Sequence, residues 1–442
     1  MYLIRQGTAW TRVLCTSSLL VSFLFVGMAS VASARPVCER SKAVIKALEA
    51  KLNLKCDHIA ERDLRKIAAL YIGPTSPMLL KSDDLIGLTM LKNLSLKATG
   101  SASSIPDGFW TPVSNVLETL SLTLATKTFP SNTLEGLSQL KSLELTLPEA
   151  VELNGGNFAD LSSLKELTIR TMRVETLPVD LLDGLRKLKT LTFAQSDVEN
   201  LPKGLLSPVP DLEVFQIWSR IDGQHTLTSI DSQFFAGLKY LRSVFVSQHR
   251  LLTIPADLFY GLDNLENIHI GNGPLITLSY DQFRGLKKLR ILNLSFNDIR
   301  SFKISWLMDS AKSLEYLSLF RLPLDTELDI NKIKAFKKLK YLGLVDINLT
   351  HIPEGSFSSL KHLESLSLSG NAISVLPDDF LAQSRKVKMV DLGRNPISRI
   401  QNSTLFSKLP SLEFLSLPEE LWDEDFEKIV EALPSTVRTS RY

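Results

Sequence analysis

The 442-residue chain has few cysteines and almost no excess of either charge. It contains three cysteines, and 50 lysine and arginine residues stand against 48 aspartate and glutamate residues. So few cysteines exclude a disulfide-dense small domain. The charge balance gives no electrostatic case for nucleic acid or an anionic membrane as a partner. Leucine, by contrast, is abundant: 80 residues, in a chain whose hydrophobic fraction of 44% is typical of a large core rather than of disorder.

Sequence patterns of the common enzyme classes are also missing. The six histidines are scattered, without an H-E-x-x-H pair, and no phosphate loop, dinucleotide fingerprint or G-x-S-x-G nucleophile turn occurs. No set of nucleophile, base and orienting group can be assembled from the residues. We therefore expect a protein that is not an enzyme and that carries no cofactor and no metal.

The N-terminal segment, residues 1–34, has the features of a secretory signal peptide. Arg5 and Arg12 precede an apolar stretch over residues 13–29, and Ala32-Ser33-Ala34 is a small-x-small cleavage pattern. The alternative is a membrane anchor, but the apolar stretch is short for a full span, and no later run reaches about 18 apolar residues. We expect a secreted or periplasmic product without membrane insertion.

Cleavage would remove Cys15 and leave two cysteines, Cys38 and Cys56, at the start of the mature chain. In an exported protein this pair predicts a disulfide. A metal site would need further ligands, and only His58 lies nearby in sequence. A pair of buried thiols is the remaining alternative.

Leucine follows a long period. An apolar-x-x-apolar-x-apolar pattern recurs fifteen times, and eight of its fourteen spacings are 24 residues. Polar residues alternate with the leucines, so each unit predicts a strand with one buried face, which only a stacked neighbour can cover. The units start at Ile67, Leu91, Leu117, Leu140, Leu164, Leu188, Leu212, Leu241, Leu265, Leu289, Leu314, Leu339, Leu363, Val387 and Leu412.

The clearest units, residues 289–297 and 363–380, resemble the leucine-rich-repeat family of the extracellular type, with about 24 residues per unit. The resemblance implies an α/β solenoid: a curved horseshoe with a parallel concave sheet and helical caps at both ends. Together with the preceding patterns, it divides the chain into a signal peptide (1–34), an N-terminal helical cap with the disulfide (35–66), about 15 repeats (67–418) and a C-terminal cap (419–442). Helices are expected within residues 39–52 and 419–433, where apolar residues have helical spacing.

The family pattern also implies a buried aromatic residue in the return segment and an asparagine at the ninth position that bridges neighbouring turns. The aromatic occurs as Phe109, Phe158, Phe235, Phe259, Phe283, Phe357 and Phe380. The asparagine is kept only as Asn297, Asn371 and Asn395. Because buried turn groups need partners, we expect irregular curvature in the first half and regular geometry over residues 289–400.

The third, fifth and seventh residues of each unit should face the concave surface. They are small or charged in the early units and become aromatic in the middle units, and rings on a polar face are typical of binding hot spots. The alternative is that these rings stack on one another and stabilise the sheet. The candidate ligand-binding residues are Gln216, Trp218, Phe245, His269, Tyr316, Phe320 and Tyr341.

The unit starting at Leu212 is longer than the others, with its surplus within residues 220–228. This loop is either a lip of the site or a tolerated surface insertion. The function that these features indicate is an exported, non-enzymatic recognition scaffold. It would act as a monomer and bind a protein partner, with or without attached glycans, on its concave face. The alternatives are a structural or adhesive component of an envelope or matrix, and an inhibitor of a partner enzyme.

Overall fold

The computed structural model describes residues 36–74, 79–98, 104–126, 129–149, 151–171, 177–220, 226–400 and 402–442. The predicted signal peptide and part of the long unit, residues 221–225, lie outside these ranges. Within the described ranges, no helix combines the length and the apolar character needed to cross a membrane.

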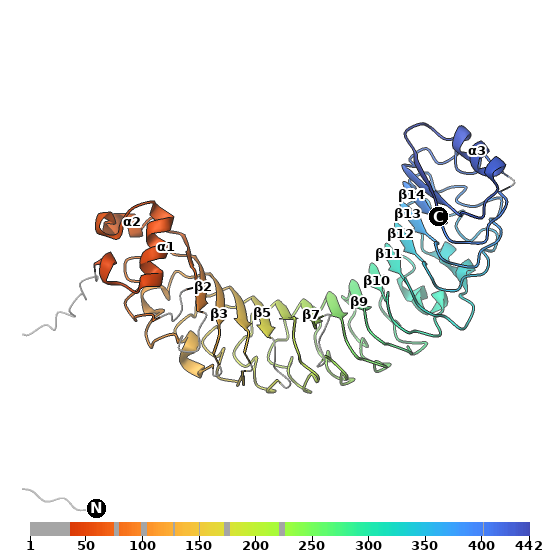
Figure 1. Ribbon diagram of the computed structural model, residues 1–442. Helices are drawn as coiled ribbons and strands as arrows, with labels where there is room; N and C mark the ends of the chain where they lie inside the picture. The colour runs from red at the N-terminus through yellow and green to blue at the C-terminus, as the bar shows by residue number, and fades with distance from the viewer. Residues whose placement is uncertain are drawn as a thin grey trace, which may run out of the picture.

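The chain is a curved solenoid whose concave side is one parallel sheet, with its strands in sequence order (Figure 1). The predicted α/β horseshoe is therefore confirmed. Among the described residues the strands are β1 (Ala69–Ile72), β2 (Asn93–Ala98), β3 (Thr119–Leu124), β4 (Ser142–Leu147), β5 (Glu166–Thr171), β6 (Thr190–Ala194), β7 (Val214–Trp218), β8 (Ser243–Ser247), β9 (Asn267–Gly271), β10 (Ile291–Asn293), β11 (Tyr316–Ser318), β12 (Tyr341–Gly343), β13 (Ser365–Ser367), β14 (Met389–Asp391), β15 (Phe414–Leu417) and β16 (Arg438–Arg441).

Each of the fifteen predicted units supplies one strand, which begins two residues after the unit start. The register places equivalent leucines side by side: Leu94 pairs with Leu120, which pairs with Leu143. These side chains are almost fully buried and form a thin, continuous core. All seven predicted return-segment phenylalanines are buried, and so are Phe302, Phe336 and Phe406, which the family pattern did not identify.

The ninth-position asparagines bridge neighbouring turns as expected. The Nδ2 of Asn297 donates to the carbonyl oxygens of Ile270 and Leu294, both at 2.8 Å. Asn371 and Asn395 make the equivalent pairs of bonds. Strands β10 to β14 have three residues each, against five or six in β2 to β9, and Figure 1 shows the sheet curving most strongly where the strands are short.

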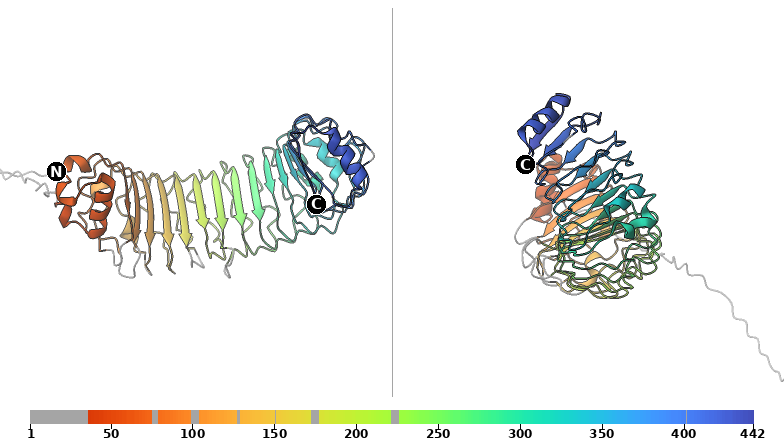
Figure 2. Two further views of the ribbon diagram at one scale, coloured as in Figure 1. Left: turned by 45° about the horizontal axis from the view of Figure 1, so that its top comes forward. Right: turned by 90° about the vertical axis from the view of Figure 1, so that its right-hand side faces the viewer.

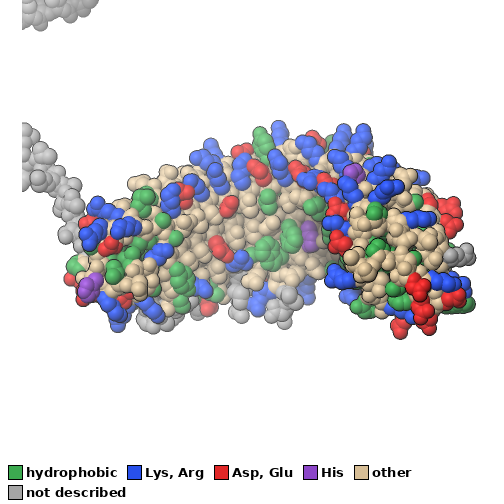
Figure 3. Space-filling model, turned by 90° about the horizontal axis from the view of Figure 1, so that it is seen from above, with side chains coloured by type: hydrophobic (Ala, Val, Ile, Leu, Met, Phe, Trp, Pro, Cys, Tyr) green, Lys and Arg blue, Asp and Glu red, His purple; other side chains and the backbone are tan. Residues whose placement is uncertain are grey.

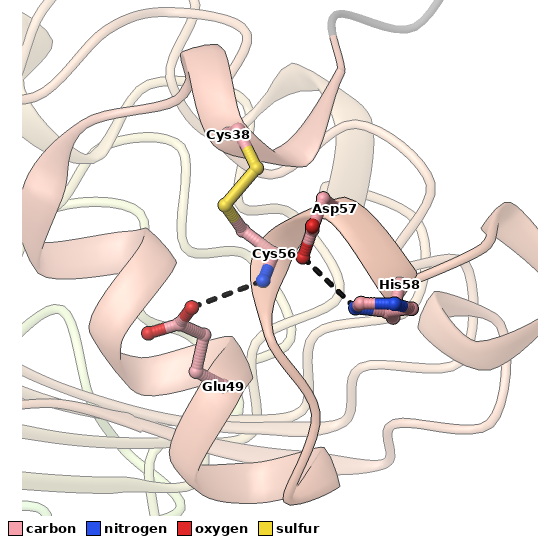
Figure 4. The surroundings of a disulfide bond; sticks show 5 residues. All are labelled: Cys38, Glu49, Cys56, Asp57 and His58. Atoms are coloured by element: carbon pink, nitrogen blue, oxygen red, sulfur yellow. Dashed lines mark hydrogen bonds and ion pairs between the residues drawn. A yellow bond between two sulfur atoms is a disulfide. The ribbon is translucent and has the colours of Figure 1, made fainter.

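The N-terminal end of the solenoid is covered by short helices: η1 (Val37–Glu39), α1 (Lys42–Leu52), η2 (Cys56–His58) and α2 (Glu61–Leu64). Val44 and Leu48 of α1 face the core, as the helical spacing predicted. The Cys38–Cys56 disulfide is confirmed, with its Cα atoms 5.1 Å apart. Figure 4 shows this bridge beside Glu49, whose Oε1 accepts a hydrogen bond of 3.0 Å from the backbone N–H of Cys56.

The C-terminal end has the predicted helix, α3 (Asp423–Ala432), and also β16, which sequence analysis did not identify. Its pairing with β15 places Thr439 and Arg441 in the columns that leucines occupy elsewhere. The Arg441 guanidinium lies 5.2 Å from the ring centre of Phe426 and 2.6 Å from the Asp423 carboxylate. A charged group therefore closes the end of the core. Figure 2 shows the strands between these two ends.

Short 3-10 helices occupy several return segments on the convex side: η3 (Thr111–Val113), η4 (Ser131–Leu134), η5 (Ile304–Ser310) and η6 (Ile330–Ala335).

Candidate functional site

All seven candidate ligand-binding residues lie on or at the end of concave strands, and all are half-buried. Gln216, Phe245 and His269 are direct partners in the register of β7, β8 and β9. Trp218 lies two residues further along β7. Figure 3 looks into the concave face and shows hydrophobic side chains gathered near its middle, beside a histidine.

The structure brings four of the seven residues together as a central cluster, which consists of Gln216, Trp218, Phe245 and His269. The Trp218 and Phe245 rings meet edge to face, with centroids 5.9 Å apart and planes at 86°. The His269 ring stacks on Phe245 at 4.3 Å and 9°. Adjacent parallel strands are about 4.8 Å apart, so rings at paired positions come into contact in this way.

The other three residues form a separate tyrosine cluster of Tyr316, Phe320 and Tyr341. The two tyrosine rings stack at 4.2 Å and 6°. Phe320 lies over Gly343, where an added Cβ would be 2.2 Å from its Cε1. Burial, and then the neighbouring Tyr316, raise the pKa of Tyr341. Strand β10, with Ile291 and Asn293 at the paired positions, separates this cluster from the central one.

A hollow of about 700 Å³ adjoins the central cluster. Of the predicted residues, Gln216, Trp218 and Phe245 line it, whereas His269 and the tyrosine cluster do not. The complete described lining is Gln195, Gln216, Trp218, Ser219, Arg220, Phe245, Ser247 and Gln248.

Sequence analysis missed Gln195 and Gln248, because they occupy the eighth position of their units, beyond the positions expected to face outward. Both have left-handed backbone, with φ of 49° and 54°. Asn272 and Phe296, at the eighth position of the next two units, share this conformation. The eighth position recurs at the same spacing in every unit, and this spacing is the sequence signal that could have identified Gln195 and Gln248 as equivalent residues.

The lining of the hollow is chemically mixed. Two aromatic rings provide apolar surface, while three amide side chains and two serine hydroxyls provide hydrogen-bond donors and acceptors. Arg220 contributes a positive charge, and no carboxylate occurs among the described lining residues. Because Arg220 is the first residue of the predicted lip, this end of the long unit does border the site. Such a surface suits a ligand with an apolar face and groups that form hydrogen bonds.

His269 of the central cluster and the nearby His249 both have a pKa below the ordinary value of a histidine side chain. His249, at the ninth position of its unit, is buried; its Nδ1 accepts a hydrogen bond of 3.1 Å from the Leu251 N–H, and its Nε2 has no partner. Burial, and secondarily the nearby His269, lower the pKa of His249 to about 4. Burial also lowers the pKa of His269. Among the described residues, no group of three histidine, cysteine or acidic side chains is arranged to hold a metal ion.

Comparison with known proteins finds similar sequences in two parts of the chain and similar folds over most of it. Residues 239–299 and 337–397 match the sequence profile of the leucine rich repeat. No curated protein sequence matches the chain. A leucine-rich-repeat protein of Leptospira interrogans has a similar structure, with 23% identity and a TM-score of 0.70 over 84% of this chain and 88% of that one.

Two receptor complexes have the same fold. A chain of the Toll–Spätzle complex of Drosophila shares 18% identity, with a TM-score of 0.63 over 87% of this chain and 52% of that one. This chain therefore spans about half of that one. A plant peptide hormone receptor shares 18% identity, with a TM-score of 0.57 over 81% of this chain and 68% of that one. The profile match over residues 239–299 and 337–397, the 24-residue phase and the stacked parallel strands agree, and the chain has the leucine-rich-repeat fold.

Proposed function

We propose that this protein is an exported, non-enzymatic scaffold that binds a protein partner through the central cluster and the hollow beside it. The observation that carries the proposal is the placement of Trp218 and Phe245 at a 700 Å³ hollow on the concave sheet. The Toll–Spätzle complex, formed by a chain of the same fold, supports a protein as the class of partner.

The chemistry of the hollow favours recognition over catalysis. Trp218 and Phe245 can bury much apolar area at a small cost in side-chain entropy, which is how aromatic hot spots stabilise complexes. Gln195, Gln216 and Gln248 can orient a partner's polar groups by hydrogen bonds. The stacking of Phe245 on His269 fixes the ring before binding, so less freedom is lost when the partner arrives.

Two features support export. The Cys38–Cys56 disulfide is of the kind that persists in oxidising compartments. The N-terminal pattern of residues 1–34 fits a signal peptide that is removed on secretion or on entry into a periplasm. The monomeric state is supported by Arg441, because an inward-pointing charge at a sheet edge opposes edge-to-edge pairing.

Affinity capture with the mature protein, followed by measurement of Kd for the captured partner, tests the proposal. Trp218→Ser should weaken binding at least 30-fold, which corresponds to the loss of about 2 kcal/mol typical of a hot spot. Tyr316→Ser is the matched control, because it removes a half-buried concave ring far from the hollow and should leave Kd nearly unchanged. A captured partner that binds Trp218→Ser with the wild-type Kd would show that the hollow is not the site.

A further inference from the structure

One edge of the solenoid is rich in lysine and arginine, although the whole chain has nearly equal numbers of basic and acidic residues. It is the edge where the chain enters each strand. The last two residues before the unit start are cationic pairs in three units: Lys287-Lys288, Lys337-Lys338 and Arg385-Lys386. The two intervening units carry one cation each, Lys312 and Lys361. All eight side chains are exposed, and we call them the basic edge.

The parallel register turns this sequence pattern into a line in space. Equivalent positions of neighbouring units lie side by side, with strands about 4.8 Å apart. In Figure 3, lysine and arginine side chains follow the upper edge of the concave view, which is the edge where the strands begin. The basic edge is therefore a continuous row of positively charged side chains that extends across five successive units.

A neighbouring row of charges neutralises itself. The second residue of each successive unit is alternately basic and acidic, from Lys189 to Glu413. In this row Glu315 pairs with Arg290 at 3.0 Å and with Lys340 at 2.8 Å, and these hydrogen bonds lower the pKa of Glu315 to about 2. The carboxylates of Glu213, Glu266 and Glu315 are thus directed to cations of the same row and not to the basic edge.

The basic edge has no such neutralisation. Within the described part of the chain, no carboxylate lies within 4.0 Å of its side-chain nitrogens. Its polar contacts are those of Lys288 with the Asn264 side chain at 2.7 Å and of Lys386 with the His362 ring at 3.4 Å. These positive charges lie in one row without acidic partners, and their mutual repulsion is unfavourable. A bound polyanion would reduce that repulsion.

We propose that the basic edge binds a linear anionic polysaccharide that bears sulfate or uronate groups. The two positions before each of these five unit starts hold the eight cations, Ser313 and His362, but no Phe, Tyr or Trp, whereas single-stranded nucleic acids are held largely by bases stacked on such rings. It also follows the curve and twist of the solenoid, which a flexible chain can follow but a flat bilayer cannot (Figure 2). This surface is distinct from the concave hollow, so its ligand and the protein partner can be bound at the same time.

Binding to immobilised heparin, a sulfated polysaccharide, tests the inference. The edge variant is Lys337→Gln/Lys338→Gln/Lys361→Gln. The matched control is Lys42→Gln/Lys46→Gln/Lys51→Gln, which removes the same number of exposed charges from α1. We expect wild type and control to bind alike and to elute with salt. The edge variant should bind on the order of 100-fold more weakly at low ionic strength, because each cation near an anionic surface contributes about a factor of five.

Several results would overturn the inference: no retention of the wild type on heparin, equal losses in the edge and control variants, or an unchanged edge variant. The same proteins are also measured on a DNA oligonucleotide and on phosphatidylserine vesicles at the same salt concentration. Tighter wild-type binding to DNA or to vesicles than to heparin would contradict the assignment of a polysaccharide. Circular dichroism of both variants confirms that each retains the fold.

Discussion

At the scale of single residues, His249 shows how this chain replaces a missing asparagine. Gly273 occupies the ninth position of the following unit, and a Cβ there would lie 2.3 Å from Cε1 of His249. The imidazole therefore fills the space that a side chain at position 273 would use. The replacement leaves Nε2 buried without a partner, and adding a proton at Nδ1 would break the hydrogen bond that this atom accepts from the Leu251 N–H.

His249 makes the fold sensitive to acid. Its pKa is about 4 in the folded protein, below the ordinary 6.5, so the unfolded chain binds the proton first as pH falls. The contribution of neutral His249 to the free energy of unfolding is fully present above pH 6.5 and is lost progressively toward pH 4. At pH 5 the loss is about 2 kcal/mol.

Urea unfolding at pH 7.5 and pH 5.0 measures this effect. His249→Asn should narrow the difference between the two midpoints, while His362→Asn, which removes an exposed histidine, should not. Equal pH dependence in the wild type and both variants would disprove the role given to His249.

At the scale of secondary-structure elements, the ninth-position amides join each turn to the one before it. The Oδ1 of Asn371 accepts bonds from the N–H groups of Ile347 and Leu349, at 3.1 and 3.0 Å, in addition to the bonds its Nδ2 donates. One buried side chain thus satisfies backbone groups of two units.

The exchange between His249 and Gly273 predicts a compensating pair of substitutions. Gly273→Asn alone should destabilise the protein by about 1–3 kcal/mol, because the new side chain collides with the imidazole. Adding His249→Asn removes the collision and supplies amides at both ninth positions. The double variant should therefore recover most of the lost stability in thermal or urea unfolding. Additive losses in the two single variants and the double variant would show that the residues do not share one space.

The fold could be predicted from sequence where the physical cause was a repeated apolar side chain. The start of every strand from β1 to β15 follows from the leucine phase, since one buried face per unit leaves little choice of register. Strand β16 was not predicted, because Thr439 and Arg441, which occupy its leucine positions, are not apolar.

The candidate site was predicted less completely. Outward positions identified Trp218 and Phe245 correctly as concave rings, because alternation along a strand fixes the face of each residue. The rings are divided into the central cluster and the tyrosine cluster because Ile291 and Asn293 of β10, which lie between them, are not aromatic. Gln195 and Gln248 reach the hollow through left-handed backbone, which the alternation of side chains along a strand does not predict.

At the scale of the whole molecule, the solenoid presents two chemically different surfaces. The concave face offers rings and amides around one hollow, and the edge where the chain enters the strands offers a file of cations. The thin core between them needs both ends closed, by α1 with the disulfide at one end and by Arg441 at the other. Function on such a scaffold lies in the residues between the leucines.

Hydroxyl-radical footprinting of the protein with and without its captured partner tests whether the hollow is the binding site, because it reports the solvent exposure of individual aromatic side chains. We predict that the partner protects Trp218 and Phe245 from oxidation, while Tyr240 and Tyr260, which are exposed outside the hollow, keep their reactivity. Unchanged oxidation of Trp218 and Phe245 in the saturated complex would contradict the account.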